Sequence, residues 1–248
     1  MIGIIFIGNQ TAQLLRLMNR DVLKEKDYSQ ITQTAQQVGT EIAPLTDIIQ
    51  VEYRATRTTV SEIINNPREI YQLAYQYLSQ NNTSHPSNSE VFFLFLSLYF
   101  NRGHMFRNYD HFSNYAIDIM STKNYQEIMK MDWSKKVPTD ILNRFVTPNY
   151  IKAYHQQILK VVQIRLVEIQ SAINLHHLQK QQWPSRLDDL KEYLGQIPID
   201  PFTDKPFLLG QENGKVYVYS PGPDNKDDKA QIVYDPTNGT ISPGDIRS

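Results

Sequence analysis

The stretch at residues 150–181, YIKAYHQQILKVVQIRLVEIQSAINLHHLQKQ, decides the architecture of this chain. It runs for about nine helical turns without Gly or Pro, which makes a rod roughly 50 Å long. Its apolar residues form two stripes, one that begins at Ile151 and another that begins at Val161. A helix with two apolar stripes is packed from two directions. We therefore predict a long central helix with different partners on its two sides.

Glycine and proline are distributed unevenly along the 248 residues. Gly103 is the only glycine between residues 40 and 182, whereas six of the ten glycines and eight of the 13 prolines lie from Pro184 onward. This distribution predicts helices first and then turns and strands. The expected fold is mainly α with a C-terminal α+β module, divided into a helical body at 1–148 and a second part at 149–248. We expect helices at about 3–25, 28–65 with an interruption at Pro44, 68–80, 89–101, 109–121, 124–132, 139–146 and 149–181.

The C-terminal part predicts short strands joined by turns. Such strands are not stable alone, so we expect a small antiparallel sheet of three or four strands packed on the central helix. An Asn-Gly pair is a strong hairpin signal. The expected elements are a tight turn at Thr203-Asp204, strands from Phe207 and Lys215 joined at Asn213-Gly214, a third strand at 231–234, and a turn at Asn238-Gly239 into a short strand at 240–241.

The composition excludes several classes of function. The formal net charge is -1, which gives no general electrostatic reason to bind nucleic acid or an anionic membrane. The absence of cysteine excludes disulfides, thiolate catalysis and cysteine-based zinc or iron–sulfur sites. The apolar start at residues 1–8 is far shorter than the roughly 20 residues that span a bilayer. It predicts a buried first helical turn; the alternative is that the chain is a piece of a longer, anchored protein.

Four motifs follow the central helix in order: Trp183-Pro-Ser-Arg-Leu-Asp-Asp-Leu, Ile197-Pro-Ile-Asp-Pro-Phe, the hairpin, and Tyr219-Ser-Pro-Gly-Pro-Asp-Asn-Lys-Asp-Asp. Together they resemble the globular head of the major pseudopilins of type II secretion, which are type IV pilin-like. The resemblance covers roughly the last 90 residues. Bacterial hypothetical proteins with a helical domain ahead of such a tail also look similar to this chain.

The resemblance implies a position on the periplasmic or extracellular side of a bacterial envelope, a membrane anchor outside this chain, and other envelope or secretion proteins as partners. It also implies calcium, because the last motif forms a calcium-holding loop in that family. Asp224 matches the loop aspartate of the family, Asn225 stands where glycine is usual, and Asp227 and Asp228 align loosely with later acidic ligands. The central helix is too polar to enter a bilayer, so fibre assembly through it is not expected.

On chemistry alone, the same loop is a candidate calcium site. Calcium takes six to eight oxygen ligands, and a turn restrained by Pro and Gly offers several of them. The alternative is a solvated acidic turn whose charge is offset by Lys226 and Lys229. The candidate ligands are Asp224, Asn225, Asp227 and Asp228.

No phosphate-binding loop or nucleophile elbow is present in the sequence, and we expect a non-enzymatic structural or protein-binding component. Two other classes of function remain open. One is a metal-dependent enzyme that uses His104, Asp110 and His111, since a spacing of seven residues places both imidazoles on one helical face. Histidines of this kind more often only contact neighbouring helices. The other class is a cytoplasmic adaptor.

An apolar run at residues 91–100, VFFLFLSLYF, has one polar member and is too short to span a membrane. A helix that is apolar all round is typical of a buried position, so the run predicts a helix at the centre of the body. The alternative is a surface that docks another protein or touches lipid.

Overall fold

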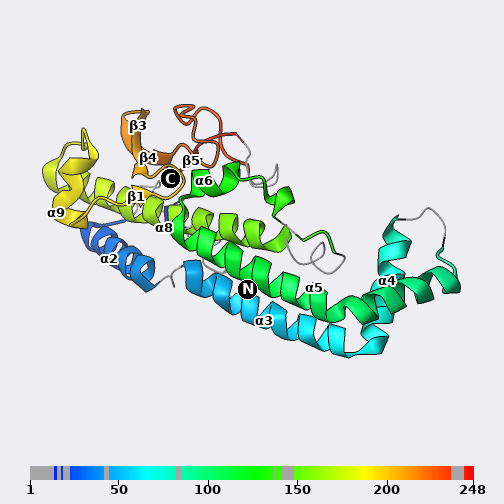
Figure 1. Ribbon diagram of the computed structural model, residues 1–248. Helices are drawn as coiled ribbons and strands as arrows, with labels where there is room; N and C mark the ends of the chain where they lie inside the picture. The colour runs from blue at the N-terminus through cyan, green and yellow to red at the C-terminus, as the bar shows by residue number, and fades with distance from the viewer. Residues whose placement is uncertain are drawn as a thin grey trace. The chain divides into compact units, whose positions relative to one another are not determined.

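The computed structural model describes residues 14, 15, 18, 23–41, 45–81, 85–136, 138–140, 148–235 and 243–248. The chain divides into two compact units, each built from separate segments. Unit 1 comprises residues 1–43, 124–130 and 155–248, and unit 2 comprises residues 44–123 and 131–154. Figure 1 shows the elements in chain order. Among the helices of the described residues, none is long and apolar enough to span a bilayer.

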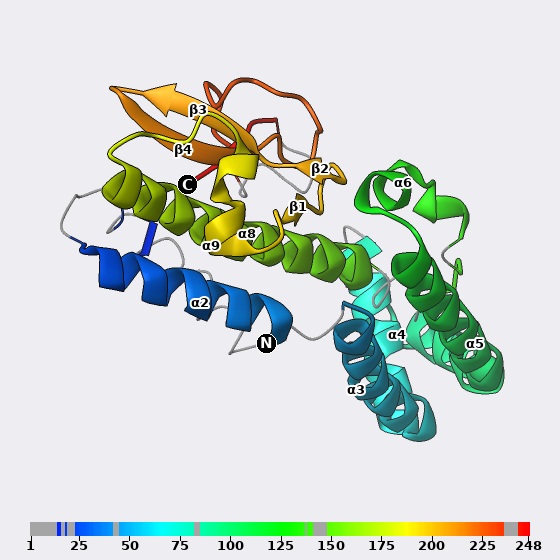
Figure 2. The ribbon, with the colours of Figure 1, turned by 90° about the vertical axis from the view of Figure 1, so that its left-hand side faces the viewer.

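The predicted central helix is confirmed as α8, Pro148–Lys180, which runs through the middle of unit 1 from His155 onward. Helix α2, Glu25–Glu41, lies along one side of α8, and the β-strands lie on the other side (Figure 2). This is the packing from two directions that the apolar stripes predicted. On the α2 side, an apolar cluster joins the two helices; its buried members include Tyr28, Ala35, Ile164, Val167 and Leu175.

Polar contacts also fix both sides of α8. Toward α2, the hydroxyl groups of Thr32 and Ser171 lie 2.7 Å apart, and both residues are buried. Toward the sheet, the Gln170 amide donates to the carbonyl of Val216 at 3.3 Å and accepts from the backbone N–H of Val218 at 3.2 Å. The helix is thus joined to the sheet through backbone groups of a strand.

The chain turns back after α8 through a short helical segment. Trp183 stacks on His177, with the ring centroids 3.8 Å apart. The carboxylate of Asp189 accepts hydrogen bonds from the backbone N–H groups of Ser185 at 3.0 Å and Arg186 at 3.2 Å, which caps the segment. The helical segment consists of the 3-10 helix η2, Leu187–Leu190, and α9, Lys191–Leu194.

Two antiparallel sheets follow, and the two predicted turns are confirmed. The first sheet pairs β1, Ile199–Asp200, with β2, Lys205–Pro206, around a turn at 201–204. The second contains the predicted hairpin of β3, Leu208–Glu212, and β4, Lys215–Ser220. Its Asn-Gly turn has φ of 52° at Asn213 and 78° at Gly214, as a tight two-residue hairpin requires.

The third strand of the larger sheet is β5, Ile246–Arg247, which pairs with β4; the prediction of residues 231–234 was wrong. In that segment, Val233 makes only an isolated bridge, with Asp245. Its side chain and that of Ile232 are exposed. The local sequence therefore has the apolar pattern of a strand, but these side chains do not pack on the core. The turn and strand predicted at 238–241 lie outside the described residues.

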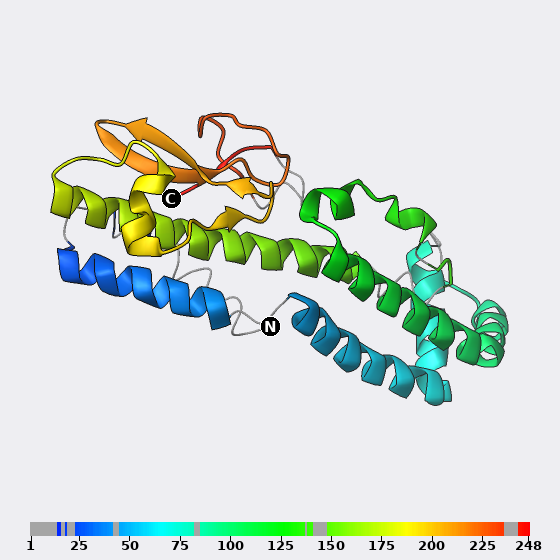
Figure 3. The same cartoon turned by 60° about the vertical axis from the view of Figure 1, so that its left-hand side comes forward.

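Unit 2 is built around α5, Asn88–Thr122, which contacts α3, Leu45–Asn65, and α4, Pro67–Asn81 (Figure 3). The ring of Phe112 on α5 packs edge-on against Trp133, with the centroids 6.3 Å apart. Trp133 opens the 3-10 helix η1, Trp133–Lys135. Helix α6, Tyr125–Lys130, lies between these elements in sequence but belongs to unit 1.

Several helix boundaries differ from the prediction. The helices expected at 89–101 and 109–121 are one helix, because a single glycine in a helix costs only about 1 kcal/mol and the buried face continues past Gly103. The helix expected at 28–65 is observed as α2 and α3, in agreement with an interruption at Pro44. The helices expected at 3–25 and 139–146 lie mostly outside the described residues.

The aromatic run of α5 is not buried all round, which corrects the prediction of a helix at the centre of the body. Val91 and Leu98 are buried. Phe92, Phe93 and Phe100 are 50%, 71% and 77% exposed. A run that is apolar on every face does not reveal which face meets a neighbouring helix, and here only one face does.

Candidate functional site

The acidic loop that follows β4 is held in place from its first residues. Ser220, at the end of β4, is buried and its hydroxyl accepts a hydrogen bond from the backbone N–H of Gly222 at 2.9 Å. Gly222 has φ of 73°, and a Cβ atom there would lie 2.6 Å from the carbonyl oxygen of Gly244. Glycine is therefore required at this position, where the loop passes close to the C-terminal segment.

The four predicted calcium ligands lie in this loop, and two of them accept local hydrogen bonds. The Asp224 carboxylate accepts from the backbone N–H of Lys226 at 3.1 Å. The Asp227 carboxylate accepts from the backbone N–H of Lys229 at 2.8 Å and from the Tyr219 hydroxyl at 3.0 Å. Asn225 has φ of 56°. Asparagine is the residue that adopts this conformation most readily after glycine, so its place in the loop is explained.

A further acid, Asp245, lies against the loop and was not identified from the sequence. It is fully buried, and its Oδ2 accepts from the backbone N–H of Ala230 at 2.6 Å. Its Oδ1 is buried without a hydrogen-bond partner among the described residues. Burial raises the pKa of Asp245, the backbone N–H groups of Ala230 and Asp228 lower it in part, and the negative charges of Asp227 and Asp228 raise it. The feature of the sequence that could have identified Asp245 is its position directly between Gly244 and the strand Ile246–Arg247.

These residues suit calcium in the kind of donor they offer. Carboxylate and carbonyl oxygens are the ligands that calcium prefers, and the bare Oδ1 of Asp245 is a buried acceptor that a cation would satisfy. Within the described residues, however, no three acidic or histidine side chains are gathered closely enough to hold an ion. Negative charge is therefore concentrated near Asp245, but the acidic side chains are not arranged as a set of ligands around one point.

A chain of three side chains lies beneath the C-terminal segment in unit 1. His155 of α8 is fully buried, with Nδ1 2.8 Å from the Tyr125 hydroxyl and Nε2 2.9 Å from the Tyr234 hydroxyl. Burial lowers the pKa of His155 to about 4. A neutral imidazole has one donor and one acceptor, so one tyrosine donates to the ring and the other accepts from it. The chain joins α6, α8 and the segment after the loop.

The neighbouring Gln126 ties α6 to the same region. Its amide donates to the carbonyl oxygens of Phe202 and Pro223, each at 3.1 Å. The ring of Phe202 packs edge-on against Tyr125, with the centroids 4.7 Å apart. Because Tyr125 and Phe202 are buried and Gln126 is half-buried and bonded to the loop, these groups are suited to positioning the loop.

The residues proposed for a metal-dependent enzyme are only partly brought together. His104 and His111 line one pocket of unit 2, of about 390 Å³, so the predicted shared face is confirmed. Asp110 does not line it: its carboxylate accepts from the Arg57 guanidinium at 3.0 Å and from the Tyr53 hydroxyl at 2.9 Å. The acid at the pocket is Asp140, which accepts from the Asn108 amide at 3.1 Å.

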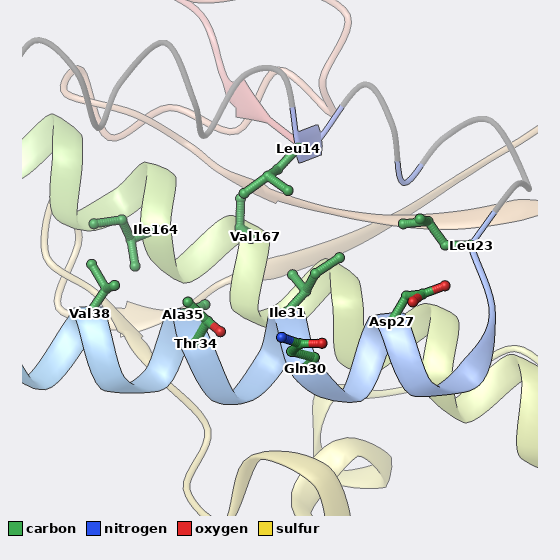
Figure 4. A pocket seen from close by; sticks show the side chains of 10 residues that line it. All are labelled: Leu14, Leu23, Asp27, Gln30, Ile31, Thr34, Ala35, Val38, Ile164 and Val167. Carbon is green, nitrogen blue, oxygen red and sulfur yellow. The ribbon is translucent and has the colours of Figure 1, made fainter.

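A second pocket, of about 490 Å³, lies in unit 1 between α2 and α8 (Figure 4). It borders the apolar cluster that joins the two helices. Among the described residues that line it, Asp27 is the one titratable side chain, and most of the others are apolar. The residues that line it are Leu14, Leu23, Asp27, Gln30, Ile31, Thr34, Ala35, Val38, Ile164 and Val167.

Compared with family models, with curated proteins and with solved structures, the chain matches none of them.

Proposed function

We propose that this protein is a non-enzymatic structural and protein-binding component of a bacterial cell-envelope or secretion assembly, and that calcium stabilises its acidic loop. The setting rests on the resemblance of the last motifs to pseudopilin heads. The calcium part rests on one observation, the buried Asp245 carboxylate with a bare Oδ1 beside a loop of further acids.

The electrostatics of the loop favour a cation. Asp227 and Asp228 raise the pKa of Asp245, which means that the three negative charges repel one another in the folded protein. A divalent ion would remove that repulsion and supply a partner to the bare oxygen. Asp245 would bind the ion together with carbonyl oxygens of the loop, and Asp227 and Asp228 would add negative charge nearby, because no three acids of the described residues are gathered closely enough to hold it directly. Asp224 and Asn225 lie nearer the start of the loop. The ion would then join the loop to the C-terminal segment.

The expected gain in stability is modest. Extracellular calcium modules have dissociation constants of about 10⁻⁴ M. At that affinity, 1 mM calcium stabilises the folded state by about 1.4 kcal/mol. For a protein of this size, such a gain raises the melting temperature by roughly 3–5 °C.

The test is a thermal melt of the chelator-treated protein with and without 1 mM calcium chloride. We expect the melting temperature to rise with calcium in the wild type and to stay unchanged in Asp245→Asn, which keeps an acceptor for Ala230 but loses the charge. Asp188→Asn is the matched control, because Asp188 is an exposed acid in unit 1, paired with Lys191 at 2.7 Å. It must keep the calcium response. A wild type that ignores calcium, or an Asp245→Asn variant that still responds, would refute the proposal.

A further inference from the structure

Six aromatic residues on α4 and α5 form a continuous surface of unit 2. Phe95 is the centre, with ring centroids 5.9 Å from Tyr71, 6.3 Å from Phe92 and 5.7 Å from Tyr99. The chain of contacts extends from Phe92 to Phe93 at 6.4 Å and from Tyr99 to Phe100 at 5.8 Å. We call these six residues the aromatic surface: Tyr71, Phe92, Phe93, Phe95, Tyr99 and Phe100.

Much of the aromatic surface is open to solvent. Three of its phenylalanines are at least half exposed, and Tyr71 is 38% exposed. A full aromatic side chain has about 200 Å² of surface, so these four residues expose roughly 500 Å². Patches of this size on a folded chain commonly mark an interaction site. Single exposed apolar residues need no such explanation, but a connected set does.

Two charged groups near the aromatic surface are engaged within the same chain. The Arg102 guanidinium lies over the Tyr99 ring, 4.1 Å from its centroid, and donates to the Tyr99 carbonyl. The Glu90 carboxylate accepts from the backbone N–H of Ser87 at 2.8 Å and so caps α5. The six members of the aromatic surface carry no charge themselves.

An uncharged surface fits a second copy of itself. In a two-fold dimer the same patch meets itself, so any charge near the axis would face an identical charge. Homodimer interfaces are also more apolar than interfaces between different proteins. Two copies of the exposed aromatic area amount to roughly 1,000 Å², close to the lower limit of about 1,200 Å² for stable specific interfaces.

We propose that the aromatic surface is the interface of a homodimer in which α5 of one copy packs against α5 of the other. Phe92, Leu96 and Phe100 follow one another at intervals of four residues and form a ridge of the kind that packs into the groove of a facing helix. The proposal names a partner for the protein-binding part of the proposed function. It is independent of calcium, so the melt described above and the experiments below can fail separately.

The first experiment is sedimentation velocity of the full chain at about 1–200 μM, since an interface of this size is at the weak end of specific association. The wild-type mass should rise with concentration from 28.9 kDa toward twice that value. The double variant Phe93→Ser/Phe100→Ser should dissociate at least about 30-fold more readily. Val51→Ser is the control, because Val51 is a 63% exposed apolar residue of α3 outside the aromatic surface, and it should behave as the wild type.

The second experiment uses the absence of cysteine from the chain. Leu96→Cys places a single thiol in the middle of the ridge, close to the expected two-fold axis. Mild oxidation should link two such chains, whereas Ser79→Cys, on an exposed part of α4, should give little product. Circular dichroism of each variant checks that the helices are retained.

Each remaining outcome contradicts the proposal. A wild type that stays at the monomer mass over the whole range has no such dimer. A dimer that survives in the double variant uses another surface. Co-sedimentation with neutral phosphatidylcholine vesicles tests lipid as the occupant. A monomer that binds these vesicles in the wild type, but not in the double variant, would assign the aromatic surface to a membrane instead.

Discussion

The two units of this protein treat polar and aromatic side chains in opposite ways. Unit 1 buries polar groups and bonds them to one another: Ser171, His155 and Asp200 are all fully buried. In unit 2, Ser113 is the one buried polar residue among those described, while several large aromatic side chains lie at the surface. Buried hydrogen bonds thus add to the apolar cluster of unit 1 in fixing its geometry, whereas unit 2 depends mainly on apolar packing and exposes a connected aromatic surface.

Asp200 shows how a buried polar group positions its surroundings. Its carboxylate accepts from the backbone N–H of Phe202 at 2.9 Å, the Ser220 hydroxyl at 2.8 Å and the Thr203 hydroxyl at 3.2 Å. These bonds connect the turn between β1 and β2 to the end of β4. The acidic loop starts at that point, so its position depends on this cluster.

The largest expected effect is on the apolar core of unit 2. Phe112→Ala removes a ring that is 3% exposed and packs against Trp133, which leaves a cavity. We expect a loss of about 4 kcal/mol in the free energy of unfolding, measured by urea denaturation with far-UV circular dichroism. A loss below about 1 kcal/mol would mean that packing does not hold unit 2.

The corresponding change in unit 1 removes a hydrogen-bond centre. Asp200→Ala leaves the Ser220 hydroxyl and the Phe202 N–H buried without their acceptor, so we expect a loss of about 3 kcal/mol. The same denaturation experiment measures it. Lys226→Ala, at an exposed position of the acidic loop, should stay within about 0.5 kcal/mol of the wild type. If Asp200→Ala costs no more than Lys226→Ala, then the buried hydrogen bonds of Asp200 do not stabilise unit 1.

Acid should weaken unit 1 through His155. Its folded-state pKa of about 4 lies below the ordinary value of 6.5, so the unfolded chain binds more protons between these values. Stability is therefore lost as the pH falls from about 6.5 to about 4, by roughly 3 kcal/mol. Burial raises the pKa values of Glu168 and Asp200, whose contributions change in the opposite direction.

The diagnostic quantity is accordingly the difference between the wild type and His155→Gln. Denaturation midpoints measured from pH 7 to pH 4 should converge as the pH falls, because the glutamine does not titrate. Parallel pH profiles for the two proteins would show that His155 is not held neutral by the fold.

The smallest effect is expected at the aromatic surface. Phe93→Ser replaces a side chain that is 71% exposed, so monomer stability at low concentration should change by no more than about 0.5 kcal/mol. Dilute samples are essential, because dimer formation would stabilise the wild type. A loss comparable to that of Phe112→Ala would indicate that the ring is part of the core of unit 2.

The sequence was informative wherever the signal is local. The glycine-free run of α8 and the Asn213-Gly214 turn were predicted because backbone preferences over a few residues determine them. The break predicted between the helices at 89–101 and 109–121 was wrong, since the buried face of α5 continues through it and outweighs the local cost of Gly103. The third strand was misplaced because pairing with β4 is a contact between distant segments, for which Ile232 and Val233 had the better local pattern.

The candidate site was predicted only in part for the same reason. Asp224, Asn225, Asp227 and Asp228 stand together in the sequence and were found. Asp245 approaches the loop from the other end of the module, and its burial follows from the fold. His155 likewise meets Tyr234 across 79 residues, a contact that no spacing rule indicates.

The two tryptophans of the chain fall one in each unit, Trp133 against Phe112 and Trp183 stacked on His177. Replacing either one by phenylalanine leaves a single tryptophan, and its emission reports on its own surroundings when it is excited at a wavelength that the 15 tyrosines do not absorb. Fluorescence curves from the two single-tryptophan proteins can therefore be overlaid to measure how far unfolding is cooperative along α8, the helix whose residues both units share.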